Sequence, residues 1–173
     1  MPYFIRTRRS VAMLLAVALI STAAVRPVST AVIPDSIQTP GDVAVIAHPD
    51  VPIADLSRAD LRRMLLGDRE FWAPGLRVTL FIRAPIARER DVAVQDICEM
   101  TEAQFRQHWI AKVFRADTPT GPKIVYSADM AVDQVSRTPG AIGFVAAAQA
   151  AGKNVKILRI DGRAPGQSGY RLK

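Results

Sequence analysis

Short runs of apolar and β-branched residues alternate with helical patterns along most of this chain. Five runs predict β-strands: Val43–Ala47, Val78–Ile82, Ile124–Tyr126, Ala141–Val145 and Val155–Ile160. Runs such as VAVIA and AIGFV are apolar without alternation, which is typical of strands covered on both faces. We therefore expect a sheet with helices packed against both of its sides.

The segment after the first run carries a complete set of helix signals. Ser57 is a suitable N-cap residue, and Leu61, Met64 and Leu65 then fall on one helical face. Gly67 follows the last of these apolar residues, where a helix commonly ends. A short amphipathic helix is expected between Ser57 and Gly67.

A second helix start is marked by a T-x-x-Q capping box at Thr101–Gln104. Phe105, Trp109 and Val113 follow with the spacing of one buried helical face. Three further helices are expected over Ala87–Met100, from Ser127 to about Arg137, and over Ala146–Ala151.

Strands separated by helices favour an α/β fold with a single, mostly parallel sheet flanked by helices. We assign this single lobe to residues 42–162 and expect the polar, glycine-containing residues 163–173 to form a C-terminal tail. The length of 173 residues and the hydrophobic content of 49% are consistent with one folded domain and exclude wholesale disorder.

The first 24 residues have the pattern of a cleaved secretory signal peptide. Arg6, Arg8 and Arg9 precede the apolar run Val11–Val25, and small residues follow near its end. This run is shorter than the ~20 residues that span a bilayer, so no permanent membrane span is expected. Residues 25–41 contain several prolines and no periodicity, which predicts a linker. The expected location is periplasmic or otherwise exported.

The basic character of the chain belongs largely to this targeting segment. The net charge is +7, and removal of residues 1–24 takes away three arginines and no acids, which leaves 20 basic and 16 acidic residues. Export also separates the protein from chromosomal DNA. No nucleic-acid partner is therefore expected.

Catalytic and metal-binding patterns do not emerge from the sequence. His48 and His108 are 60 residues apart and lack metal-ligand spacing, and Cys98 is the single cysteine, for which a buried packing role is expected. No nucleophile elbow, P-loop or dinucleotide fingerprint occurs. We predict a protein that is not an enzyme, with no cofactor and no metal.

A candidate anion site lies where the second strand run meets the following helix. Arg83 ends that strand, and the helix opens near Ala87 with Arg88 and Arg90. Ligands of open α/β sheets gather at such junctions, where helix N-termini offer free N–H groups and guanidinium groups bind oxyanions. The alternative is that Arg88 and Arg90 are solvated, or paired with neighbouring acids on their own helix.

Several stretches between Val43 and Tyr170 resemble one known family. They are L-S-R-A-D-L at 56–61, L-L-G-D-R with a tryptophan at 65–72, W…V-F at 109–114, T-P-G-A-I-G-F at 138–144, and D-G-x-A-P…Y-x-L at 161–172. Their order is similar to that in the periplasmic phosphate-binding proteins of ABC uptake systems, within the type 2 solute-binding superfamily. The resemblance implies one lobe of such a protein, with phosphate or another oxyanion as ligand and an ABC transporter permease as partner.

Two departures from the family pattern qualify this expectation. The family has two lobes that clamp the ligand, whereas this chain has the length of one, so a second lobe or a homodimer would have to complete the cleft. The family's ligand loop resembles R-x-D-x-S-G-T, whereas this chain has R-A-P-I-A-R-E from Arg83 to Glu89. Only the arginine is kept, and Pro85 lacks a backbone donor.

Two functions remain open on these grounds. In the first, the exported lobe binds a small oxyanion near Arg83 without catalysis. In the second, the lobe is an envelope adaptor that has lost the ligand and binds a protein partner through a surface patch. The T-P-G-A-I-G-F stretch has a purely structural explanation as well, because Pro139 and Gly140 end a helix and Gly143 permits close packing.

Overall fold

The structure is a computed structural model that describes residues 41–173. The predicted signal peptide, and the predicted linker apart from its last residue, lie outside the described residues. Within the described residues no helix is long and apolar enough to cross a membrane.

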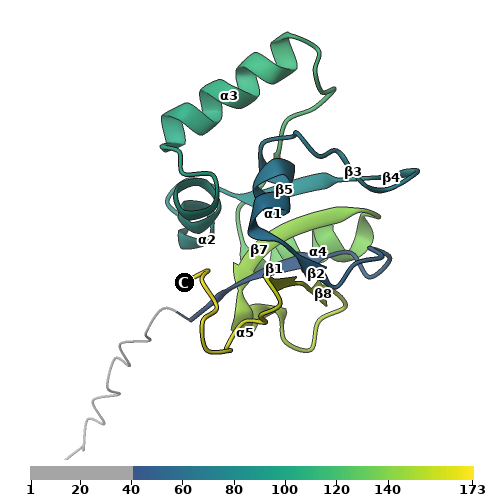
Figure 1. Ribbon diagram of the computed structural model, residues 1–173, viewed down its shortest axis with the longest axis vertical. Helices are drawn as coiled ribbons and strands as arrows, with labels where there is room; N and C mark the ends of the chain where they lie inside the picture. Colours follow the sequence, from purple (N-terminus) through teal and green to yellow (C-terminus); the bar gives the residue numbers. More distant parts are fainter. Residues whose placement is uncertain (1–40) are drawn as a thin grey trace, which may run out of the picture. The chain divides into compact units, whose positions relative to one another are not determined.

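A five-stranded sheet forms the centre of the molecule (Figure 1). Its strand order is β6 (Lys123–Val125), β5 (Thr79–Arg83), β7 (Ala141–Ala146), β1 (Val43–Ala47) and β8 (Lys156–Ile157). β5 is parallel to β6 and to β7, whereas β1 is antiparallel to both β7 and β8. The prediction of an α/β fold with a mostly parallel sheet is confirmed, with β1 as the strand that runs against the others.

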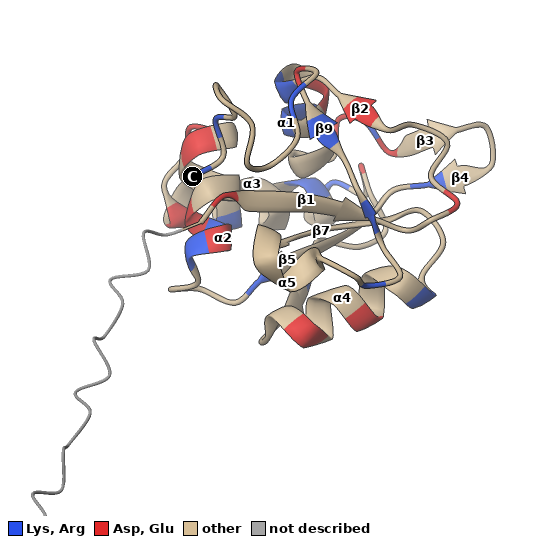
Figure 2. Ribbon diagram, turned by 90° about the horizontal axis from the view of Figure 1, so that it is seen from below, with Lys and Arg blue, Asp and Glu red and all other residues tan. Residues whose placement is uncertain are grey.

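Side chains of the central strands separate into two apolar layers. Val43, Val45 and Ala47 of β1 join one core cluster, whereas Ala44 and Ile46 join the other. All five residues are fully buried, as expected for a strand covered on both faces. Figure 2 shows α4 (Ala128–Arg137) and α5 (Ala147–Ala150) on one side of the sheet and α1 (Arg58–Leu65) on the other.

The predicted helix caps form as the sequence indicated. The Ser57 hydroxyl accepts a hydrogen bond from the Asp60 N–H at the start of α1, and the Ser127 hydroxyl accepts from the Met130 N–H in α4. Thr101 and Gln104 form both hydrogen bonds of a capping box at the start of α3 (Glu102–Phe114). These three helices therefore begin within one or two residues of their predicted positions.

The buried face of α3 is shorter than its sequence spacing indicated. Phe105 is buried and Trp109 is half-buried, but Val113 is 42% exposed. The expectation of a buried Val113 was wrong. The second half of α3 extends beyond the sheet (Figure 1) and contacts the end of α1 through His108, Trp109 and Lys112, and these contacts leave Val113 uncovered.

The helix expected over Ala87–Met100 is shorter and of two kinds. It begins as α2 (Arg88–Asp91) and continues as the π-helical turn η1 (Val92–Ile97). The Cys98 N–H donates to the Ala93 carbonyl, five residues back, at 3.2 Å. Four of the six residues of η1 are buried in the core.

Short strands at the periphery complete the fold. The run Val155–Ile160 divides into β8 and β9 (Arg159–Ile160), and β9 pairs in parallel with β2 (Asp55–Leu56). β3 (Phe71–Ala73) and β4 (Leu76–Arg77) form a small hairpin. Only the first half of the predicted last strand therefore belongs to the central sheet.

The segment expected to be a C-terminal tail is part of the lobe. Tyr170 and Leu172 are buried in the same core cluster as α1. The Tyr170 hydroxyl donates to the Val43 carbonyl at 2.7 Å, and the Val43 N–H donates to the Leu172 carbonyl at 2.9 Å. The polar composition of residues 163–169 concealed two apolar anchors at the end of the segment, so the lobe extends beyond residue 162.

The T-P-G-A-I-G-F stretch is explained by close packing. Gly140 has a φ of +72°, and a Cβ there would lie 2.1 Å from the Arg77 carbonyl oxygen. A Cβ at Gly143 would lie 3.1 Å from Val135 of α4. The Trp72 indole N–H donates to the Gly140 carbonyl at 2.9 Å, which fixes this turn further. The structural explanation of both glycines is confirmed.

Replacement of Gly140 by alanine is expected to destabilise the lobe strongly. The new Cβ adds a backbone clash to the strain of positive φ, so the free energy of unfolding should fall by about 2–4 kcal/mol in urea denaturation. Gly75→Ala is the matched control, because Gly75 has a φ of +81° but open space around it. A loss at Gly140 no larger than that at Gly75 would contradict the packing argument.

Candidate functional site: the junction of β5 and α2

The predicted anion site lies at the carboxyl end of β5. Arg83 is the last residue of that strand, and α2 begins five residues later, at Arg88. Between them Ala84 to Ala87 form a tight turn in which the Ala87 N–H donates to the Ala84 carbonyl at 3.3 Å. The structure therefore has the strand–turn–helix arrangement that the sequence predicted at this position.

Arg83 is held below the surface of this junction. Its side chain is 15% exposed, and its Nε lies 3.7 Å from the Glu89 Oε2. Nε and Nη1 are both buried and have no hydrogen-bond partner among the described residues. Buried donors are nearly always paired in proteins, so two donors on one guanidinium indicate an unfilled polar position.

Arg90 is buried and fully paired with neighbouring groups, so its role is structural. Its guanidinium is 7% exposed and donates two hydrogen bonds to the carboxylate of Glu102, at 2.8 and 2.6 Å. A third hydrogen bond runs from Nη1 to the Arg83 carbonyl at 2.8 Å, and the group also lies 5.9 Å from the centre of the Phe105 ring. Arg90 thus links the end of β5 to the start of α3.

The other two predicted residues, Arg88 and Ala87, have contacts of a different kind. Arg88 donates from Nη1 to the Gly41 carbonyl at 2.7 Å. Ala87 is the N-cap residue of α2 and offers no side-chain hydrogen bond, while its carbonyl accepts from Arg90 and Asp91. The fold brings all four predicted residues to one turn, with different partners for each arginine.

Ile86, at the tip of the same turn, was not singled out by the sequence. It has a φ of +78° and a side chain that is 97% exposed. A β-branched residue in this left-handed region is a true outlier, and such strain gathers at functional positions. Pro85 immediately before it was the available signal, since proline followed by a residue with positive φ is typical of a type II turn.

The hydrogen bonding between Arg90 and Glu102 also changes the pKa of the Glu102 carboxyl group. It holds the pKa of Glu102 below its ordinary value, in spite of the opposing effect of partial burial. The pair therefore remains ionised and bonded well below neutral pH.

The other reactive side chains have ordinary roles. Burial raises the pKa of Cys98 to about 12, which makes its thiol inert at neutral pH. The Asp50 N–H donates to His48 Nδ1 at 3.1 Å, and His108 Nε2 lies 2.9 Å from the Leu66 carbonyl. Residues 41–173 contain no cluster of three or more residues that could hold a metal ion.

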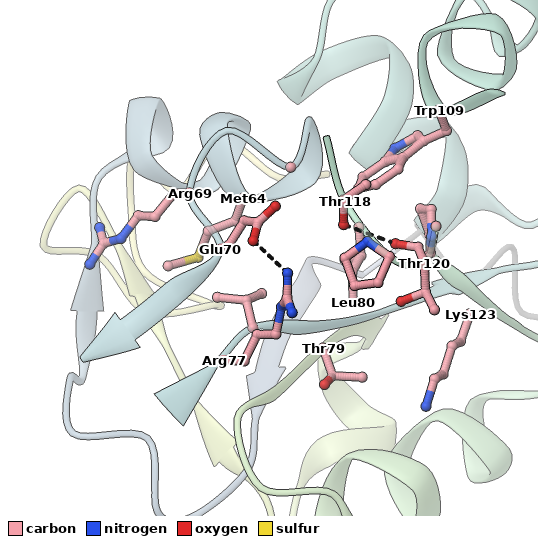
Figure 3. A pocket seen from close by; sticks show the side chains of 15 residues that line it. Met64, Arg69, Glu70, Arg77, Thr79, Leu80, Trp109, Thr118, Thr120 and Lys123 are labelled. Atoms are coloured by element: carbon pink, nitrogen blue, oxygen red, sulfur yellow. Dashed lines mark hydrogen bonds and ion pairs between the residues drawn. The ribbon is translucent and has the colours of Figure 1, made fainter. Parts of the chain in front are cut away.

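A separate pocket of about 260 Å³ opens at the other end of β5 (Figure 3). Trp109 of α3 forms one wall, and the loop from Thr118 to Lys123 forms another. Arg77 and Glu70 form an ion pair at 2.5 Å inside it. No sequence motif indicated this pocket, because its walls come from segments up to 59 residues apart between Met64 and Lys123.

Comparison with solved structures finds the fold of the described lobe within part of several proteins of phosphate transport systems. A proposed phosphate ABC transporter substrate-binding protein from Clostridium perfringens, with bound phosphate, is 16% identical, with a TM-score of 0.57. An ABC-type phosphate transport receptor from Vibrio cholerae is 16% identical (TM-score 0.56), and PstS from Borrelia burgdorferi is 21% identical (TM-score 0.55).

The matched region covers 72% of this chain in each case, but only 47%, 48% and 49% of the three known chains. The described lobe shares the fold of part of these proteins. This chain thus matches about half the length of the known structures. No protein-family model and no curated protein matches the sequence.

Relief of the strain at Ile86 is expected to stabilise the protein. Ile86→Gly should raise the free energy of unfolding by about 1 kcal/mol, because glycine adopts a positive φ without steric cost. Ile86→Ala is the control, since it removes the exposed side chain but keeps the strained Cβ. Equal stability of the two variants in urea denaturation would show that the turn is not strained.

The ion pair between Arg90 and Glu102 is expected to make stability depend on pH. Since the pKa of Glu102 is lower in the folded state, its contribution is present above the unfolded value of about 4.3 and is lost as pH falls through the folded value. Glu102→Gln should therefore be less stable than the native protein at pH 7, with a difference that shrinks below about pH 4.

The measurement is urea denaturation across this pH range, with Glu99→Gln as control. Glu99 is 66% exposed and lies 3.5 Å from Arg62, so its replacement should have little effect. The native and Glu102→Gln proteins would then differ in the free energy of unfolding by an amount that depends on pH. A difference that stays constant with pH would contradict the lowered pKa of Glu102.

Proposed function

We propose that this chain is an exported, non-catalytic single lobe that binds a small oxyanion, such as phosphate, at the junction of β5 and α2. The observation that carries the proposal is Arg83, whose buried Nε and Nη1 have no hydrogen-bond partner among the described residues. The shared fold with phosphate-binding proteins, one of them solved with phosphate, supports the same ligand class. Export rests on the signal-like pattern of residues 1–24.

The residues of the junction would have distinct roles around such an anion. Arg83 supplies the charged donors, and Arg90 positions it by holding its carbonyl at 2.8 Å. The first backbone N–H groups of α2 would supply further donors, and Arg88 would add positive charge nearby. Charge-assisted hydrogen bonds from a guanidinium are stronger than neutral ones, so Arg83 contributes most of the affinity.

The same geometry predicts weak binding by the lobe alone. Glu89 brings a carboxylate within 3.7 Å of Arg83, where it competes with an incoming anion. Pro85 lacks an N–H, and the side chains of Ile86 and Ala87 offer no hydroxyl donor. A single lobe would also leave the ligand exposed to solvent screening. A second lobe, a second copy of the chain or a transporter permease would strengthen binding by closing the site.

Calorimetric titration of the mature protein with phosphate, sulfate and molybdate tests this proposal. We expect a dissociation constant near 100 μM, equivalent to about −5.5 kcal/mol, for at least one oxyanion. Arg83→Ala should abolish the heat, whereas Glu89→Gln should tighten binding by removal of the competing carboxylate. Arg137→Ala is the charge-matched control, because Arg137 is a largely exposed arginine of α4 that pairs with Asp133.

The adaptor function has an observation of its own in its favour. Five large apolar side chains lie exposed on α3 and around β6: Ile110 at 56%, Val113 at 42%, Phe114 at 91%, Ile124 at 49% and Tyr126 at 73%. A groove of about 330 Å³ has Ile110 and Ile124 in its lining and the buried Phe105 beside them. Exposed apolar patches of this kind commonly mark protein interaction sites.

The titration separates the two functions. If no oxyanion produces heat, and a partner protein co-purifies with the native chain but not with Ile110→Asp or Phe114→Asp, the adaptor function replaces the first proposal. If binding is retained in Arg83→Ala, the oxyanion site lies elsewhere and the assignment to this junction is wrong.

A further inference from the structure

The pocket at the amino end of β5 is separate from the junction just described. Thr79 is the first residue of β5 and lines the pocket, whereas Arg83 is the last residue of the same strand. An inference about this pocket therefore goes beyond the oxyanion proposal and does not rest on it.

The apolar wall of the pocket is a firmly held indole ring. Trp109 Nε1 donates to the Leu65 carbonyl at 3.2 Å, and the ring packs against Gly67 so closely that a Cβ there would lie 2.7 Å from it. Met64 and Leu80 extend this surface. Since Trp109 is only half-buried, the pocket has a flat, rigid aromatic wall open to a ligand.

The polar side of the pocket carries no net charge. Glu70 and Arg77 pair with each other at 2.5 Å and together present acceptors and donors, and Thr120 adds a hydroxyl group (Figure 3). Thr118 is bonded to the Thr120 carbonyl at 3.3 Å. The groups that remain for a ligand are therefore a neutral set of mixed donors and acceptors.

The two other cations in the lining are engaged elsewhere. Arg69 lies 3.3 Å from Asp60, and Figure 3 shows its side chain extending away from the pocket. The Lys123 amine lies 5.5 Å from the centre of the Phe81 ring, over the opposite face of the sheet. The Glu70 carboxylate beside Arg77 would repel an anion, and the charge of Arg77 is already balanced by this pairing, so an anionic ligand is disfavoured.

We infer that this pocket binds a single neutral sugar ring. A pyranose has a flat face of C–H groups, which suits the Trp109 ring, and an edge of hydroxyl groups, which suits Glu70, Arg77 and Thr120. A purely apolar ligand would leave these polar groups without partners. The volume of about 260 Å³ lies just below that of pockets for drug-sized ligands, about 300–1,000 Å³, and matches a molecule of one ring.

Titration of the tryptophan fluorescence with methyl β-D-glucoside and N-acetylglucosamine tests this inference. The chain has two tryptophans, and Trp72 is buried with its indole bonded to Gly140, so a change on titration reports Trp109. Saturable binding of at least one of the two sugars is expected. Sorbitol, which has hydroxyl groups but no rigid ring face, is the matched probe and should not bind comparably.

Variants locate the response within the pocket. Thr120→Val removes one hydroxyl and should weaken sugar binding about fivefold, the usual effect of losing one neutral hydrogen bond. Gly121→Leu should block the pocket; a Cβ at Gly121 would lie 3.8 Å from the Trp109 ring, which is ordinary contact and compatible with folding. Thr138→Val, outside the pocket lining, and Arg83→Ala, at the oxyanion junction, should bind sugar as the native protein does.

Each outcome of these titrations either supports or contradicts sugar binding in this pocket. Weaker sugar binding in Thr120→Val and lost binding in Gly121→Leu, with native binding in the two controls, supports the inference. Absence of saturation with both sugars, equal binding of sorbitol, or unchanged binding in Gly121→Leu would overturn it. Arg83→Ala alters the oxyanion junction and leaves the pocket lining unchanged. A failure of the sugar inference can therefore be told apart from a failure of the oxyanion proposal.

Discussion

The buried guanidinium of Arg90 holds the candidate site together. It joins three segments that follow one another along the chain: the end of β5 through the Arg83 carbonyl, its own helix α2, and the start of α3 through Glu102. A guanidinium that is 7% exposed requires such compensation, because an unpaired charge in this position would carry a large desolvation penalty. Arg90 thus fixes the strand end that carries Arg83 to the first turn of α3.

The strand β5 connects two chemically different ends of the lobe. At its carboxyl end lie a partly unsatisfied arginine, a competing carboxylate and a strained turn. At its amino end lie an aromatic wall and a balanced ion pair. The first arrangement favours an anion, and the second favours a neutral molecule, because the net charge of the groups that face each space differs. One strand can thus support two unrelated recognition sites without competition between them.

Local signals predicted local structure well. Ser57, Thr101 and Ser127 mark helix starts through hydrogen bonds that span only three residues, so neighbouring sequence contains all the needed information. Predictions that required knowledge of distant partners were less accurate. Val113 has the spacing of a buried residue but no neighbouring element to cover it, and Tyr170 lies in a polar segment but reaches the Val43 carbonyl, 127 residues away in sequence.

The sequence alone determined the α/β alternation, the helix caps, the glycines of the tight turns and the placement of Arg83 at a strand end. These features depend on backbone preferences and on the periodicity of apolar residues, which are properties of short segments. Only the tertiary structure decided that Arg90 is buried against Glu102, that Glu89 faces Arg83, and that Trp109, Glu70 and Thr120 line one pocket. Those outcomes depend on which side chains meet across the fold, and charge and burial at a contact are set by both partners together.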